Sequence, residues 1–92
     1  MASDVSVERA AISGGIGCCK TSIHELQSAA SSLKSDYGKA GQGWKDQKYA
    51  ALGGIVDECC SALTNPISEL QECIGTLQDL LNSITDYESV NL

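Results

Sequence analysis

Apolar or small residues recur at helical spacing through the first half of the chain. These positions are Val5, Ile12, Ile16, Cys19, Ile23, Leu26, Ala30, Leu33 and Tyr37. After the first interval the gaps alternate between four and three residues, which is typical of a helix packed along a second helix at a shallow angle. Ser3 and Asp4 can supply the side-chain acceptor of a helix start. The pattern predicts a first helix over about residues 4–36.

Three glycines interrupt this pattern and allow two interpretations. Gly14, Gly15 and Gly17 each cost roughly 1 kcal/mol relative to alanine inside a helix. Either the helix begins after Gly17, or it runs through the glycines and they let a neighbouring backbone come close. The apolar spacing keeps its phase across the glycines, which favours the continuous helix.

The stretch that follows has the residues of a chain reversal. Gly38, Gly41 and Gly43 are expected to supply the positive φ angles of a helix C-cap and a tight turn, giving a loop over about residues 37–45. A connection of this length usually joins antiparallel helices. The sequence therefore predicts a helical hairpin.

The only tryptophan of the chain, Trp44, lies in this loop. Asp46 is the predicted N-cap of the second helix, because its side chain can accept from the free amides of the first turn. Trp44 precedes this cap, and an apolar residue there can pack on the first turn, where Tyr49 and Ala50 are within reach.

The second half of the chain carries apolar columns with a period of seven residues. The first column is Tyr49, Val56, Leu63, Leu70, Leu77 and Ile84, and the second is Gly53, Cys60, Ile67, Ile74 and Leu81. A third column runs alongside them and contains Leu52, Cys59, Pro66, Cys73, Leu80 and Tyr87. The opposite column is polar and contains Glu58, Asn65, Glu72, Asp79 and Asp86. The pattern predicts a second helix over about residues 46–88 with an unusually wide apolar face.

Pro66 is the one breaker within the second helix. A proline costs about 3 kcal/mol in a helix interior, so the helix is expected to kink there. Alternatively, Pro66 is the first residue of a third helix capped by Thr64 or Asn65. The spacing of apolar residues is kept across the proline, which favours one kinked helix.

The two predicted helices do not match in apolar width. Leaving a large apolar side chain of the third column in water forfeits on the order of 1.5–3 kcal/mol. We therefore predict a single all-α domain, residues 1–92, folded as an antiparallel two-helix hairpin that completes a four-helix bundle as a dimer. The predicted partner interface is Leu52, Val56, Cys59, Leu63, Ile67, Leu70, Ile74, Leu77, Leu80, Leu81 and Ile84.

The distribution of charged residues argues against a nucleic-acid partner. The chain has twelve acidic and six basic residues, and residues 49–92 carry seven acids and no lysine or arginine. This half would repel phosphate, so nucleic acid is not expected as a partner. The start of the chain lacks a secretory signal, and no apolar run is long enough to span a bilayer. We expect a protein made in the cytosol whose export, if it occurs, needs no cleaved signal.

The sequence gives no support for catalysis, and neither an enzyme nor a cofactor is expected. The five cysteines are read mainly as small, reduced hydrophobic residues, because their number is odd and no secretory signal is present. For a hairpin reversing near residue 40, Cys18-Cys19 and Cys59-Cys60 would lie at about the same height. A metal site there and a Cys19–Cys60 disulfide remain open as minor alternatives. His24 is read as a partly exposed structural residue.

A tryptophan in the loop of a two-helix hairpin of about this length resembles the Trp-x-Gly family of small type VII (Esx-type) secretion proteins. The resemblance spans nearly the whole chain, although Trp44-Lys45-Asp46 carries aspartate where the family has glycine. Family members carry an export signal after the second helix, an aromatic residue followed four residues later by an acid. Tyr87 is suitably placed, but position 91 is asparagine and the flanking residues Asp86 and Glu88 are acidic.

The resemblance implies a protein-binding subunit of a type VII pathway. Its expected partner is another helical protein, either a larger toxin with an LXG-type helical domain or a Trp-x-Gly-type protein, or a second copy of the chain. Trp44, Asp46 and Tyr87 would then serve recognition by the export machinery, including its ATPase. A self-assembling helical adaptor unrelated to secretion is the alternative.

Overall fold

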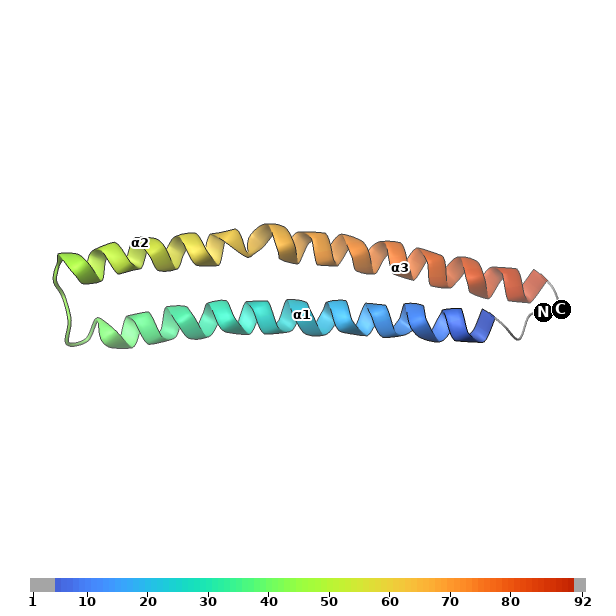
Figure 1. The fold of residues 1–92 in the computed structure, drawn as a ribbon, viewed down its shortest axis with the longest axis horizontal. Helices are drawn as coiled ribbons and strands as arrows, with labels where there is room; N and C mark the ends of the chain where they lie inside the picture. The colour runs from blue at the N-terminus through green and yellow to red at the C-terminus, as the bar shows by residue number, and fades with distance from the viewer. Residues whose placement is uncertain (1–4, 91–92) are drawn as a thin grey trace.

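The computed structural model describes residues 5–90 of the chain, with side chains up to residue 85. It contains three helices: α1 at Val5–Ala40, α2 at Gln47–Ala62 and α3 at Thr64–Val90. Figure 1 shows α1 running antiparallel to α2 and α3, which follow one another nearly in line. The molecule is a rod of 70 × 17 × 13 Å. The all-helical class and the hairpin are as the sequence predicts.

The interior of the rod is one layer of side chains between the two arms. Only Ile16 and Val56 are buried among the described residues. The first two apolar columns of the second arm point toward α1 and are otherwise half-buried. On α1, Leu33 is exposed although it continues the predicted spacing, and Arg9 is half-buried in the interval between Val5 and Ile12. A strict alternation of threes and fours drifts around a straight helix, so it does not mark every inward position.

The glycine run lies inside α1, as the continuous interpretation predicts. The reason differs from the expected close approach of a backbone. A Cβ on Gly14 or Gly17 would meet nothing within 4 Å, and one on Gly15 would contact only the side chain of Leu77, at 3.4 Å from Cδ1. These glycines therefore face open space or a flexible side chain.

The end of α1 corrects the sequence prediction. The helix continues to Ala40 instead of ending near residue 36, and Gly38 lies within it. No described glycine has a positive φ. The amides of Gly41, Gly43 and Trp44 bond back to carbonyls of the last turn, the last at 3.1 Å from the oxygen of Ala40. The reversal is thus made by residues 41–46 without left-handed backbone.

The later reversal fixes which residues face one another. Gly15 faces Leu77, and the thiol of Cys60 lies 3.8 Å from the carbonyl oxygen of Ala30. In this antiparallel register Cys60 lies eleven residues from the level of Cys19, about 16 Å along the helix axis at 1.5 Å per residue. The prediction that the two cysteine pairs share one height was wrong, because it placed the turn near residue 40.

Pro66 produces a short interruption in the second arm. The α-helix stops at Ala62, Leu63 keeps αR angles of φ −78° and ψ −13°, and α3 starts at Thr64. Proline has no amide hydrogen for the carbonyl of Ala62, four residues earlier, and its ring crowds that carbonyl. The single kinked helix is therefore divided at Leu63, and Pro66 is the third residue of α3 and not its first.

Candidate protein-binding site

Two tyrosines lock the arms together next to the loop. The hydroxyl of Tyr37 donates to the carbonyl of Tyr49 at 2.9 Å, and the hydroxyl of Tyr49 donates to the carbonyl of Tyr37 at 2.7 Å. Their rings stack with centroids 4.2 Å apart and planes 4° apart. Burial, followed by the neighbouring Tyr49, raises the pKa of Tyr37 and favours its neutral, donating form. We call this pair the tyrosine clasp.

Each hydroxyl of the clasp occupies space next to a glycine. A Cβ on Gly41 would overlap the hydroxyl of Tyr49, and a Cβ on Gly53 would overlap that of Tyr37. The same Tyr-x-x-x-Gly spacing occurs at 37–41 and at 49–53. This repeat is the sequence signal of the clasp. The sequence interpretation missed it because it took Gly41 as a turn residue and Gly53 as a member of an apolar column.

Trp44 sits over the clasp and is held by Asp46. Asp46 Oδ1 accepts from the amide of Tyr49 at 3.0 Å, which confirms the predicted N-cap of α2. The neighbouring Trp44 side chain, followed by the Tyr49 amide, lowers the pKa of the Asp46 carboxyl group. The ring of Trp44 lies 5.5 Å from that of Tyr49 at 55°, as the predicted packing before the cap requires.

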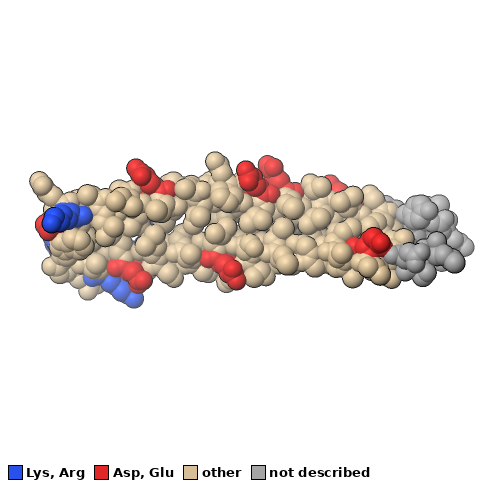
Figure 2. All heavy atoms as spheres, viewed as in Figure 1, with Lys and Arg blue, Asp and Glu red and all other residues tan. Residues whose placement is uncertain are grey.

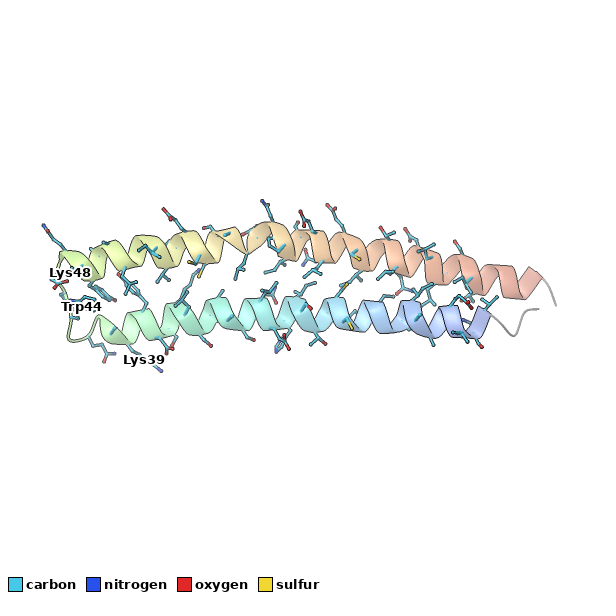
Figure 3. The ribbon with its side chains drawn as sticks, viewed as in Figure 1. Lys39, Trp44 and Lys48 are labelled. Carbon is cyan, nitrogen blue, oxygen red and sulfur yellow. The ribbon has the colours of Figure 1, made fainter. Side chains whose placement is uncertain are left out.

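Trp44 nevertheless keeps 41% of its surface exposed. The indole is therefore fixed on one side and open on the other. Figure 3 places Lys39, at the end of α1, and Lys48, in the first turn of α2, at this same end of the rod. Figure 2 shows acidic side chains along the outer sides of both arms and also beside the lysines at the loop end. The loop end thus combines a packed aromatic ring with charges of both signs.

A second exposed feature follows the length of the second arm. It is an apolar strip on α2 and α3, the open strip, made of Leu52, Ile55, Cys59, Pro66, Cys73 and Leu80. The three large side chains Leu52, Ile55 and Leu80 are 37%, 56% and 48% exposed. At 100° per residue these positions share one flank of the helix. Ile55 was absent from the predicted columns.

The predicted partner-interface residues divide into two groups. Val56 is buried, and seven others are half-buried against α1: Leu63, Ile67, Leu70, Ile74, Leu77, Leu81 and Ile84. Leu52, Cys59 and Leu80 remain on the surface. The exposed members of the predicted interface therefore lie in the open strip and not in the column that contains Val56. Tyr87 lies outside the described side chains.

The cysteines and the histidine considered in the sequence analysis do not form a reactive or metal-binding cluster among the described residues. Within the described residues all five cysteines are free thiols, and no group of three or more His, Cys, Asp or Glu side chains is arranged to hold a metal. His24 is exposed on α1. None of the described helices is long and apolar enough to cross a membrane.

Comparison with models of protein families, with curated proteins and with solved structures finds no match to this chain.

Proposed function

We propose that this chain is a small protein-binding subunit of a type VII (Esx) secretion pathway. It acts as the partner or targeting factor of a larger helical-domain toxin or of a Trp-x-Gly-type secreted protein. Export of the complex uses a route without a cleaved signal. The observation that carries the proposal is the open strip, whose large apolar side chains α1 leaves in water.

The physical basis is the area that one arm cannot cover. Burying a large aliphatic side chain is worth roughly 1.5–3 kcal/mol, so covering Leu52, Ile55 and Leu80 is a substantial driving force for association. The strip runs along one flank of the rod, which suits an amphipathic helix or a second hairpin laid alongside. The expected complex is a four-helix bundle.

The loop end suits a separate recognition task. Trp44 is held by Asp46 and the clasp, so its exposed face needs little ordering when a partner binds. Tryptophan is among the residues that most often dominate protein interfaces. We assign Trp44, with Lys39 and Lys48 beside it, to contact with the export ATPase.

The first test is co-expression with a helical protein of the LXG or Trp-x-Gly type encoded by a neighbouring gene, followed by sizing with light scattering. A stable complex is expected, and Leu52→Ser with Leu80→Ser should weaken it at least tenfold. Val7→Ser is the matched control, because Val7 is an exposed apolar residue on α1 outside the strip. Equal effects of both changes would refute the strip as the docking face.

Trp44→Ala separates targeting from docking. The complex should form with unchanged affinity while export of the partner is lost. Loss of complex formation by Trp44→Ala would instead make the loop part of the docking face. A homodimer that binds no helical partner would contradict the secretion role and favour a self-assembling adaptor.

A further inference from the structure

Cys19 and Cys73 are brought together by the register of the hairpin. Gly15 on α1 faces Leu77 on α3, one turn away from both cysteines in the direction of the chain ends. This register sets Cys19 opposite Cys73, and Cys73 lies close enough to help raise the pKa of Cys19, after the larger effect of burial. Cys19 is half-buried, whereas Cys73 is exposed. Two thiols on separate helices thus meet with one of them open to small molecules.

The surroundings leave room for the helices to adjust. A disulfide needs Cα atoms within about 7 Å, closer than the usual 8–10 Å between helix axes, so cysteines must lie on the facing sides of both helices. Gly17 and Gly75 flank the two cysteines, and a Cβ on either would meet nothing within 4 Å. These two positions therefore make no contact with the opposite arm that would resist an adjustment.

We propose that Cys19 and Cys73 form a reversible disulfide that joins α1 to α3, made by exchange with a small-molecule disulfide such as oxidised glutathione. This inference does not depend on the proposed secretion role. It replaces the Cys19–Cys60 bridge considered from the sequence, because Cys60 faces Ala30.

The exchange proceeds in two steps. The exposed Cys73 thiolate attacks one sulfur of oxidised glutathione, which breaks the glutathione S–S bond and releases one glutathione thiolate. Cys19 then loses its proton to solvent and attacks the Cys73 sulfur of the mixed disulfide, which releases the second glutathione. The chain gives up two electrons, and one oxidised glutathione becomes two reduced molecules. Burial raises the pKa of Cys19 and so lowers its thiolate fraction. The second step therefore depends on the closeness of Cys19 to the mixed disulfide and not on the acidity of its thiol.

Closing the segment between residues 19 and 73 restricts the unfolded chain. We expect the oxidised hairpin to melt at least about 10 °C higher than the reduced one, given the usual stabilisation by a disulfide of this loop length and the small size of the domain. Adding dithiothreitol should restore the lower melting temperature.

The test uses two matched variants of the full chain. Cys18→Ser, Cys59→Ser and Cys60→Ser together leave only Cys19 and Cys73. Cys18→Ser, Cys59→Ser and Cys73→Ser leave only Cys19 and Cys60. Both are incubated at low protein concentration in oxidised glutathione and then examined by thiol titration, intact mass and melting, each against its own reduced form so that the substitutions themselves cancel.

The first variant should lose both thiols, weigh two hydrogens less and remain a monomer with a raised melting temperature. The second should stay reduced or carry bound glutathione, without a cross-link. The proposal is overturned if the Cys19/Cys73 variant ends as stable glutathione adducts, as a disulfide between chains or as free thiols. It is also overturned if the Cys19/Cys60 variant closes equally well.

Discussion

Single residues at the loop end act through the space they leave empty. Gly41 and Gly53 have no positive φ, so their role is not conformational freedom. They leave room for the two tyrosine hydroxyls that join the arms. Gly54, directly after Gly53, faces open space. Of these two adjacent glycines of α2, Gly53 therefore leaves no space for a side chain, whereas Gly54 does.

Replacing these glycines by alanine should have effects of opposite sign. Gly53→Ala should lower the free energy of unfolding by about 1–3 kcal/mol, because its methyl group displaces the Tyr37 hydroxyl. Gly41→Ala should act in the same direction through Tyr49. Gly54→Ala should raise stability by about 0.5–1 kcal/mol through helix propensity. Urea titration measures all three, and a stabilising Gly53→Ala would show that the clasp contributes nothing.

Asp46 should make the loop end sensitive to acid. Trp44 and the Tyr49 amide hold its pKa below the usual value of about 4. A depressed folded pKa means that its contribution is complete above about pH 4 and is lost as the pH falls through the folded value. Asp46→Asn keeps a capping side chain but should remove this part of the acid dependence.

Melting curves between pH 2 and pH 7 test this point. The difference in melting temperature between the wild type and Asp46→Asn should be largest near neutral pH and shrink in acid. Glu58→Gln, an exposed acid away from the loop, is the control and should show little difference at any pH. A difference that stays constant with pH would contradict the assignment.

At the scale of the elements, the sequence predicts helix faces better than helix ends. The two inward columns of the second arm are visible because burial imposes a period that each residue obeys separately. The end of α1 cannot be seen in the sequence in the same way. Gly38 costs only about 1 kcal/mol in a helix, and the adjoining tyrosine contacts can offset this cost. The extra residues at the end of α1 shift the register of the two arms, and this shift changes which cysteine lies opposite Cys19. The residue that lies opposite depends on the length of the loop, which the local apolar pattern does not specify.

The break between α2 and α3 is a second local feature. Pro66→Ala restores an amide donor to the carbonyl of Ala62 and removes the crowding, so α2 and α3 should merge. We expect more helical signal in circular dichroism and an increase in stability of about 1–3 kcal/mol. Asn65→Ala, which changes the adjoining exposed residue without altering backbone bonding, is the control. A loss of stability in Pro66→Ala would show that packing against α1 requires the interruption.

At the scale of the whole molecule, the hairpin is a rod with a single-layer interior. Of the residues whose side chains the structure describes, only Ile16 and Val56 are buried, so each arm stabilises the other through a line of half-exposed contacts. A chain of 92 residues with such an interior is marginally stable alone. The large side chains of the open strip, Leu52, Ile55 and Leu80, lie outside this line.

Stability and partner binding should therefore respond to different residues. Val56→Ala should lower the free energy of unfolding of the isolated hairpin by about 1–3 kcal/mol, because it removes buried methyl groups. Leu52→Ser should change it by no more than about 0.5 kcal/mol, as expected at an exposed position. Denaturant unfolding of the isolated protein measures both. A large effect of Leu52→Ser would mean that Leu52 already packs within one hairpin.

The tyrosine clasp lies at one end of a rod 70 Å long, while the start of α1 and the end of α3 lie at the other. The clasp holds the two arms together at the loop end, so a small rotation of the arms there produces a large separation at their far ends. Amide hydrogens near Val5 should accordingly exchange with solvent soonest, and those beside Tyr49 last. On heating, the two arms would separate first at their far ends and last at the tyrosine clasp.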